Sequence, residues 1–274
     1  LFWSLCFTLA YAQAPLYTSN QNQYFLHGLA QAEYGHLHED WLAQTLDPTP
    51  VFSALVAFSY SLLAWPPIFY LYFGLLAGLY LFSLYGIVDH LFGVGENRAQ
   101  RWLYLALFVG LHAGGLRFLL ARFLGGEWVY LFDGGVAGQR LLGAVLQPSA
   151  FGVLLLLSIY LFLRGNVALS LIPLALTPTI HPTYFLSAAL VTISYMLILY
   201  LRDRNLRRPF LIGLGTLLGV LPMLIHTIKV FNPTKRMFIL RARELLVTFR
   251  VPHHADPAAW WHISVVIKIA LVLV

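Results

Sequence analysis

The stretch GHLHEDW near the N-terminus places two histidines and two carboxylates side by side. Such a group can bind a divalent metal ion, with His36 and His38 as ligands; Mg²⁺ and Mn²⁺ are the ions considered. It can also supply a general base, because a carboxylate such as Glu39 or Asp40 accepts a proton from a substrate hydroxyl. The alternative is a solvated loop whose tryptophan is anchored at a membrane interface.

Two further histidine groups stand out. His181 lies in the middle of a long apolar stretch, with prolines on both sides that favour a turn. Further on, Arg250 is followed closely by His253 and His254, with prolines before and after the pair. All four are candidates for binding a substrate. The alternatives are a helix-capping or interfacial histidine at 181 and a polar connector at 250–254.

Segment 229–261 is basic, and part of it has the pattern of an amphipathic helix. Arg236, Arg243 and Arg250 recur every seven residues along one face. Four apolar side chains share another face: Phe238, Ala242, Leu245 and Phe249. Such a helix lies in the headgroup plane of a bilayer, and its basic stripe attracts phosphate groups. These arginines are candidates for holding a substrate phosphate; the alternative is snorkelling to lipid headgroups.

Arg117 is a further candidate for substrate binding. It lies inside the apolar stretch 102–123. An unpaired cation within a membrane is costly, so we expect Arg117 to face a polar cavity or a carboxylate.

The composition limits what the protein can be. Of 274 residues only 10% are charged, whereas 59% are hydrophobic; an average soluble domain has about 25% charged residues. This balance excludes a disordered chain, a nucleic-acid-binding arm and an ordinary cytosolic enzyme, and it favours a polytopic membrane protein in a lipid bilayer. The single cysteine, Cys6, excludes an internal disulfide framework.

The charge-free stretches predict an all-α fold, a polytopic transmembrane helical bundle of about eight spans with additional loop helices at its outer face. Residues 51–64 are expected to form a surface helix, divided by prolines from the next span. The two ends are read as truncated spans, and a signal peptide is the alternative for 1–14. The expected spans are 1–14, 67–90, 102–123, 148–163, a hairpin over 165–201, 209–228 and 263–274.

The distribution of basic residues orients these spans. Seven arginines fall in three short loops that lie on the same side by parity: Arg98, Arg101, Arg164, Arg202, Arg204, Arg207 and Arg208. The positive-inside rule makes this side cytoplasmic. We therefore expect one transmembrane domain over 1–274, with a first outer loop at 15–66 and a basic outer loop at 229–261.

Two features concern helix packing and the first outer loop. The GxxxG spacings Gly74/Gly78 and Gly215/Gly219 permit close contact between helices. A single helix is expected to run from residue 21 to residue 34 and to stop at a glycine. Gln31 and Tyr34 share its polar face and are candidates for substrate binding.

The first loop also carries a family resemblance. A first transmembrane helix leads into NQNQYFLHGLA (20–30), then a G-x-L-x-x-D-W element (35–41), then P-x-F (50–52). This order resembles the start of the GT-C polytopic membrane glycosyltransferases, loosely and over residues 1–90. The chain also resembles a group of bacterial polytopic membrane proteins of unassigned function that carry an Arg-x-Pro-His-His element.

The resemblance implies an enzyme that moves a sugar from a polyprenyl-phosphate carrier to an acceptor on the outer face of the bacterial inner membrane. It places the carboxylate role on Asp40, with Glu39 beside it. Many family members have an acidic pair at the start of the loop helix, where this chain has Asn20, Gln21 and Asn22. An amide takes no proton at neutral pH, so either Asp40 carries the chemistry or the chain has the fold without the activity.

Two other classes of function stay open. A transporter, or a non-catalytic membrane protein of the same fold, predicts polar residues spread through the membrane and often a repeat between halves. A metal-dependent membrane hydrolase would be built on the histidines of the outer face.

Overall fold

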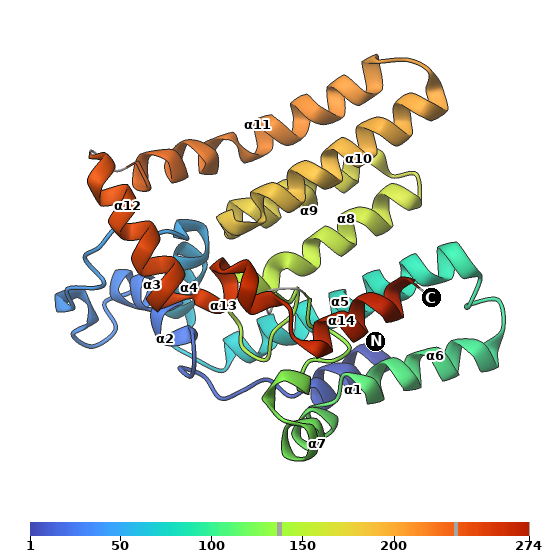
Figure 1. The fold of residues 1–274 in the computed structure, drawn as a ribbon, viewed down its shortest axis with the longest axis horizontal. Coiled ribbons are helices and arrows are strands. Elements are labelled where there is room, and N and C mark those ends of the chain that lie inside the picture. Colours follow the sequence, from blue (N-terminus) through green and yellow to red (C-terminus); the bar gives the residue numbers. More distant parts are fainter. Residues whose placement is uncertain (136–138, 233–234, 274) are drawn as a thin grey trace.

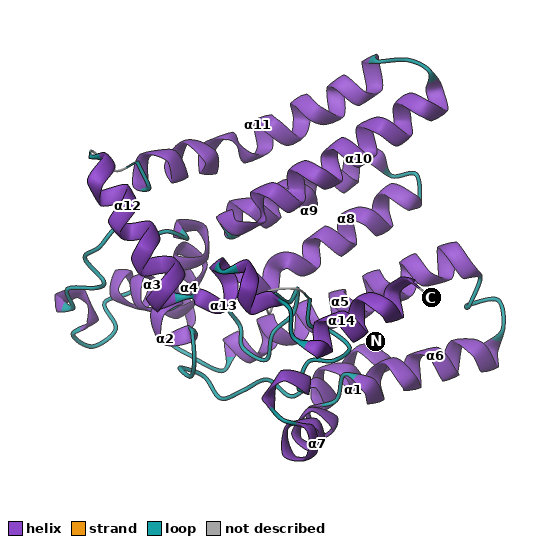
Figure 2. Cartoon of the chain, viewed as in Figure 1, coloured by secondary structure: helices purple, strands orange, loops and turns teal. Residues whose placement is uncertain are grey.

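The computed structural model describes residues 1–135, 139–232 and 235–273, and within these ranges it is all-helical, with no strand (Figure 2). The all-α prediction is therefore confirmed. The helices run back and forth along the long axis of the molecule, and shorter helices and loops gather toward one end (Figure 1). We call this the cavity end, because it holds the cavity described below.

One group of helices surrounds a core rich in aromatic side chains. α1 (Phe2–Tyr11) packs against α5 (Ile68–Phe92) and α6 (Arg98–Leu111). Phe7, Phe73 and Phe108 are among the buried residues of this core. The core continues to the cavity end, where Phe25 and Phe52 stack with 5.6 Å between ring centroids.

A second group consists of α8 (Val153–Leu163), α9 (Val167–Ile180), α10 (Phe185–Asp203) and α11 (Arg207–Val230). α9 packs on both α8 and α11, and α8 joins this group to α5 (Figure 1). Its core includes the stacked rings of Phe162 and Tyr195, whose centroids are 3.9 Å apart.

Three helical stretches are long and apolar enough to cross a membrane: Ile68–Phe92, Pro182–Asp203 and Arg207–Val230. A fourth is formed if α6 and α7 (Gly114–Leu124) count as one broken span. The prediction of about eight spans is thus not supported by the described residues. The reason is length, since α9 has 14 residues and stretches 2–11 and 148–163 are also short.

The predicted single span 102–123 is broken into two helices. α6 and α7 meet at an angle of 51°. The break lies at His112 and Ala113, where Ala113 has an extended backbone conformation that no α-helix continues through. The two adjacent glycines that follow at the start of α7 weaken helix propensity at this point.

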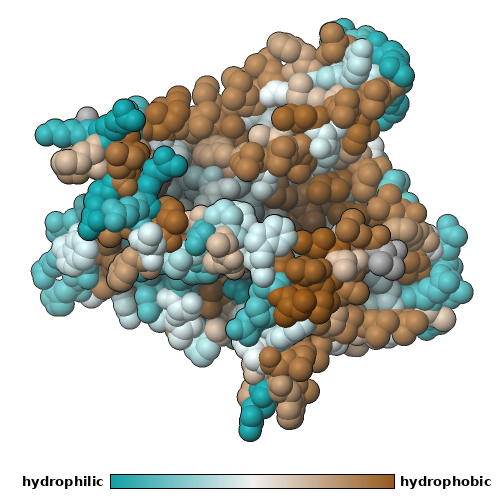
Figure 3. Space-filling model, viewed as in Figure 1, coloured by the Kyte–Doolittle hydropathy of each residue, from teal (hydrophilic) through white to brown (hydrophobic). Residues whose placement is uncertain are grey.

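The distribution of apolar side chains on the surface, like the lengths of the apolar helices, is compatible with a membrane protein. Apolar side chains cover the middle of the face in Figure 3, and hydrophilic side chains gather toward the ends. The loops after α5, α8 and α10 are together at the end opposite the cavity (Figure 1), and the seven arginines lie in these loops or in the helical turns next to them. These three basic loops thus lie at one end of the molecule, while the topology and the membrane side of the loops stay predictions.

The first loop differs from the predicted helix over 21–34. It forms α2 (Gln21–Tyr24) and α3 (Leu26–Gln31), which meet at Phe25, and helical structure ends three residues before Tyr34. Glu33 takes a positive φ of 54° that ends the turn. A short 3₁₀ turn, η1 (Leu37–Glu39), and the helix α4 (Pro50–Leu63) follow.

The basic loop forms a series of short helices. They are α12 (Arg236–Glu244), the π-helix η6 (Leu245–Arg250), α13 (Pro252–Ala255) and the 3₁₀ turn η7 (Pro257–Trp260). Residues 233 and 234, which also belong to the predicted loop, lie outside the described residues. α14 (Ile263–Leu273) ends the described chain.

Small residues bring several helices into close contact, as the GxxxG spacings predicted. A Cβ at Gly78 would lie 3.3 Å from Ser4 of α1, and one at Gly219 would lie 2.8 Å from Ala175 of α9. Among the described glycines, Gly28 in the first loop makes the closest approach to the backbone of another helix. A Cβ at Gly28 would meet the carbonyl oxygen of Ser53 at 2.6 Å, so α3 and α4 touch directly there.

This contact predicts the effect of Gly28→Ala. Alanine favours helix by up to about 1 kcal/mol over glycine, but overpacking at a rigid contact costs about 1–3 kcal/mol. We expect Gly28→Ala to lower the melting temperature of the detergent-solubilised protein. Gly110→Ala, in α6, is the control because a Cβ there meets nothing within 4 Å. If both variants melt at the same temperature, α3 and α4 do not touch as described.

Candidate functional site

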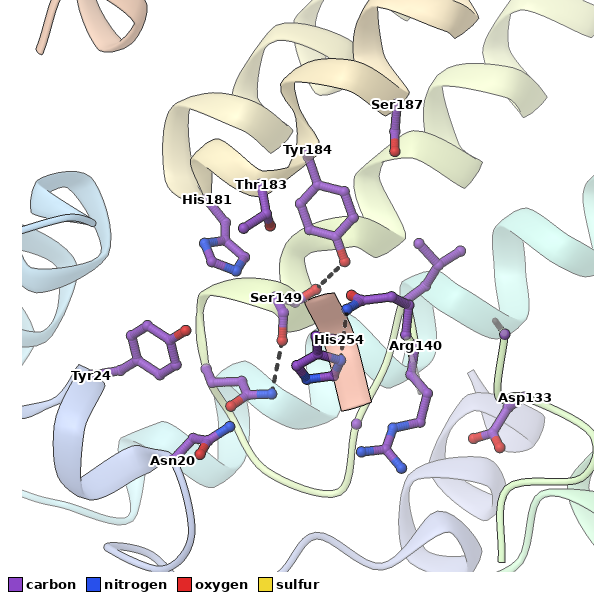
Figure 4. Close-up of a pocket in the computed structure, with 15 residues that line it drawn as sticks. Asn20, Tyr24, Asp133, Arg140, Ser149, His181, Thr183, Tyr184, Ser187 and His254 are labelled. Carbon is purple, nitrogen blue, oxygen red and sulfur yellow. Dashed lines mark hydrogen bonds between the residues drawn. The ribbon is translucent and has the colours of Figure 1, made fainter. Parts of the chain in front are cut away.

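The candidate site is a polar cavity of about 640 Å³ at the cavity end (Figure 4). Four separate parts of the chain line it: the start of the first loop, residues from 133–135 and 139–149, the tip of the α9–α10 hairpin, and α13. Its principal polar side chains are Asn20, Tyr24, Asp133, Gln139, Arg140, Gln147, Ser149, His181, Thr183, Tyr184, Ser187 and His254. The cavity therefore exists only when segments far apart in sequence have assembled.

Segment 142–146 contributes to one wall, and donors from the N-terminal part of the chain hold its backbone. The Leu142 carbonyl lies 2.5 Å from the Tyr11 hydroxyl. The Ala144 carbonyl accepts a hydrogen bond from the backbone amide of Ala14 at 2.7 Å. The Leu146 carbonyl accepts one from Gln21 Nε2 at 3.0 Å. Every second carbonyl is thus satisfied, as a buried loop requires.

Gln21 uses both ends of its amide and is fully buried. Its Nε2 donates to Leu146, and its Oε1 accepts a 2.8 Å hydrogen bond from the backbone amide of Tyr17. A carboxylate in its place could accept from Tyr17 but could not donate to the carbonyl. The amide at this position, where the family resemblance suggested an acid, therefore has a structural role in this chain.

His181 forms part of the opposite wall. It follows α9 in an extended conformation, just before Pro182, and this turn directs its ring into the cavity (Figure 4). The rings of Tyr24 and Tyr184 each form a T-shaped pair with the His181 ring, with 6.0 and 5.9 Å between the ring centroids. Its side chain is 8% exposed, and its Nδ1 has no hydrogen-bond partner among the described residues. Burial lowers the pKa of His181 to about 4, so the ring is neutral at neutral pH.

Tyr184 and Gln147 extend the polar surface next to His181. The Tyr184 hydroxyl donates to the Ser149 carbonyl at 2.7 Å, and Gln147 Nε2 donates to Ser149 Oγ at 2.8 Å. Gln147 Oε1 is buried and has no hydrogen-bond partner in the described structure. Gly152 lies directly beneath the Tyr184 hydroxyl, where a Cβ would collide with it. Two buried polar atoms of cavity-lining residues, His181 Nδ1 and Gln147 Oε1, thus have no hydrogen-bond partner within the described residues.

The other end of the cavity is charged. Asp133 and Arg140 both line it, away from His181 (Figure 4). Asp133 Oδ2 lies 2.9 Å from the Tyr11 hydroxyl, whose one proton also faces the Leu142 carbonyl. The Arg140 guanidinium lies over the ring of Tyr130, 3.6 Å from the ring centroid. A carboxylate, which can act as a base, and a guanidinium cation therefore line the same cavity.

Two more cations lie behind this end. Arg117, which is expected from the sequence to face a polar cavity or a carboxylate, is buried but is not among the residues that line the cavity; it donates to the Tyr11 carbonyl and lies 4.2 Å from that ring centroid. Lys268 interacts electrostatically with both Asp133 and Arg140. Arg140 and Lys268 thus place positive charge near Asp133 at this end of the cavity, which favours an anion.

Only one residue of the predicted histidine pair lines the cavity. His254 lines it, and Gln139 Nε2 lies 3.3 Å from its Nδ1. His253 is not among the lining residues, although its ring centroid is 4.0 Å from that of His254. Of the three predicted histidine positions at this end, 181 and 254 converge on one space.

The predicted catalytic pair lies elsewhere. Asp40 and Glu39 are exposed in the loop between α3 and α4 and do not line the cavity. Asp40 Oδ1 accepts a 2.8 Å hydrogen bond from the amide of Leu42, a local turn that accounts for this side chain. His36 and His38 are also exposed, each with a ring nitrogen 3.8 Å from Glu39 Oε1.

No group of three or more His, Cys, Asp or Glu side chains within the described ranges is placed to hold a metal ion. A Mg²⁺ or Mn²⁺ site at His36 and His38 therefore stays a prediction, and no chemical step is assigned to a metal here.

The other predicted substrate ligands also lie outside the cavity lining. Gln31 is exposed at the end of α3, and Tyr34 packs against Tyr60 at 4.8 Å. Arg236 and Arg243 are exposed on α12. Arg250 donates to Gln23 Oε1 at 3.2 Å.

The residues that sequence reasoning missed come mainly from segment 133–149. Asp133, Arg140 and Gln147 lie in a stretch without a motif, between two apolar helices. One signal was present: Asp133 and Arg140 are charged residues in a chain that is only 10% charged. Their convergence with His181 depends on tertiary contacts that no spacing along the chain reveals.

Comparisons of the chain with models of protein families, with curated proteins and with solved structures find no match. The likeness to GT-C glycosyltransferases thus stays a resemblance carried by short motifs of the first loop.

The role of Gln21 predicts that Gln21→Glu destabilises the protein. The variant removes the donor to the Leu146 carbonyl and buries a carboxylate in its place, which costs about 1–3 kcal/mol or more. Thermal unfolding followed by intrinsic fluorescence measures the loss. Asn22→Asp, at the exposed neighbouring residue, is the control and should change stability by no more than about 0.5 kcal/mol. Equal stability of both variants would show that Gln21 does not hold the wall.

His181 predicts a pH dependence of stability. Its pKa is about 4 in the folded protein and about 6.5 when unfolded. The unfolded chain therefore binds more protons between these values, so stability is lost as the pH falls from about 6.5 toward 4, by about 3 kcal/mol in total.

Melting temperatures at neutral and mildly acidic pH test this. We expect His181→Gln to reduce the acid-induced loss, because glutamine does not titrate. His36→Gln, at an exposed histidine, should keep the full loss. An unchanged pH dependence in His181→Gln would contradict the burial of a neutral ring.

Proposed function

We propose that this protein is an integral membrane glycosyltransferase that moves a sugar from a polyprenyl-phosphate carrier to an acceptor hydroxyl. In this proposal it lies in the bacterial inner membrane with the cavity at the outer face. The three basic loops at the opposite end support that orientation, because basic loops favour the cytoplasmic side.

The observation that carries the proposal is the composition of the cavity. It combines a carboxylate (Asp133), a cation (Arg140) and unpartnered buried groups suited to hydroxyls, beside helices long and apolar enough to cross a membrane. A sugar attached to a lipid phosphate needs all of these. Its phosphate needs a cation, its hydroxyls need hydrogen-bond partners, and its lipid chain needs an apolar surface.

The chemical step follows from these positions. The acceptor oxygen forms a bond to the anomeric carbon, and the bond from that carbon to the phosphate oxygen breaks. The acceptor proton passes to Asp133, and the electron pair of the broken bond leaves on the polyprenyl phosphate. Arg140 stabilises the phosphate as its charge increases, with Lys268 and Arg117 adding positive potential behind it. His181 and Gln147 hold sugar hydroxyls.

Asp133 replaces Asp40 as the proposed base. Asp133 lines the cavity that also contains the cation, whereas Asp40 is exposed in a local turn. His181 lies at the other end of the cavity from Asp133 and Arg140, so it is assigned to the sugar hydroxyls instead.

Replacing Asp133 tests the proposal. With purified protein in lipid nanodiscs and a panel of labelled polyprenyl-phosphate sugars, we expect Asp133→Asn to reduce transfer by at least about 100-fold, because general-base catalysis contributes about 10²–10⁴. Asp40→Asn is the matched control and should leave transfer within about twofold, since surface changes of this kind have small effects.

Two outcomes would contradict the proposal. Loss of transfer in Asp40→Asn with full transfer in Asp133→Asn would move the site to the first loop. Absence of transfer from every carrier by the unmodified protein, together with uptake of a solute into proteoliposomes, would favour the transporter alternative.

A further inference from the structure

The segment α12–η6 is exposed almost throughout. Every residue from Lys235 to Arg250 is exposed except Val247, which is partly buried. The most exposed apolar side chains include Phe249 at 82% and Met237 at 67%. A helix that leaves such side chains in water is uncommon unless another surface covers it.

The charges of this segment point to the nature of that surface. Arg241 forms an ion pair with Glu244 at 2.8 Å, but no ion pair within the described residues involves Lys235, Arg236 or Arg243. Three cations therefore remain uncompensated beside exposed apolar side chains. Cations next to apolar side chains match an anionic lipid surface, which offers both phosphate groups and hydrocarbon.

The π-helix changes which arginines act together. Seven-residue spacing keeps Arg236 and Arg243 on one face within α12. From Leu245 onward the chain is a π-helix, which has more residues per turn, so the same spacing no longer returns Arg250 to that face. Arg250 contacts Gln23 of the first loop instead. The predicted stripe of three arginines is thus a pair, and the third member belongs to a contact within the protein.

The direction of α12 fits a surface position. α12 starts where α11 ends, at the cavity end, and runs across the ends of the helices at a steep angle to α11 (Figure 1). In Figure 3 its region shows hydrophilic and apolar side chains side by side. A helix that crosses the ends of spanning helices lies near the headgroup plane of the bilayer.

We propose that α12–η6 docks on the anionic headgroup surface of the bilayer, with Arg236 and Arg243 bound to lipid phosphates and Phe249 among the inserted side chains. This role takes these arginines out of the substrate site, whose lining they do not join. α13 follows η6 after one residue and carries His254, so the same docking holds one wall of the cavity in place. The proposal does not depend on the proposed transferase activity.

A fluorophore at position 249 tests the docking. In the full chain carrying Cys6→Ser and Phe249→Cys, an environment-sensitive label is read in nanodiscs of phosphatidylcholine alone and with phosphatidylglycerol added. We expect blue-shifted emission and quenching by lipid-bound quenchers in the anionic nanodiscs, reversed at about 1 M salt, where the Debye length is about 3 Å. Arg236→Gln/Arg243→Gln should lower the ratio of docked to undocked label by about an order of magnitude.

The control is a double variant that removes the same amount of positive charge at the other end of the molecule. Arg204→Gln/Arg207→Gln lies at the opposite end and should leave the label docked. Emission that is equal in neutral and anionic nanodiscs, or docking that survives Arg236→Gln/Arg243→Gln, would overturn the proposal. An equal loss in both double variants would also overturn it. Because no sugar transfer is measured, this result is separate from the test of enzymatic function.

Discussion

The cavity depends on satisfying the backbone of a buried loop. Leu142 and Leu146 are almost completely buried, and a buried carbonyl without a partner is costly. The segment from Tyr11 to Gln21 supplies the donors: one phenol, one backbone amide and one side-chain amide. Residues 139–147 can therefore pass through the protein without regular secondary structure. Arg140 and Gln147 flank the three hydrogen-bonded carbonyls, and Asp133 contacts the same Tyr11 hydroxyl.

The helical framework explains why the polar site lies at one end. Along the helices, small residues such as Gly78 and Gly219 allow close packing and leave apolar side chains on the outside. Such packing favours association in lipid, where there is little hydrophobic driving force between helices. Polar side chains are therefore concentrated where loops meet. The uneven charge of the chain follows, with arginine-rich loops at one end and the cavity with its basic helix at the other.

Much of the framework could be predicted from the sequence, and much of the site could not. Charge-free stretches located α5, α10 and α11, because length and hydropathy are properties of a continuous segment. The break at Ala113 and the division of the first loop at Phe25 depend on backbone conformations that apolar patterns do not encode. His181 and His254 were identified by their residue type and flanking prolines. Asp133 was missed because Tyr11, which it contacts, and His181, which lines the same cavity, each lie more than 40 residues away in the sequence. Asp40 was predicted because it lies in a short motif with two histidines and two carboxylates, but the loop that contains it is exposed.

Ligands are expected to occupy the cavity and not the histidine-rich loop. Hydrogen–deuterium exchange of the protein in nanodiscs, with and without a polyprenyl-phosphate sugar, tests this directly because it reports both regions at once. We expect slower exchange in segments 139–149 and 181–187 and no change in segment 35–41. Slower exchange confined to 35–41, or no change in the cavity segments with a sugar donor that the protein demonstrably binds, would contradict this expectation.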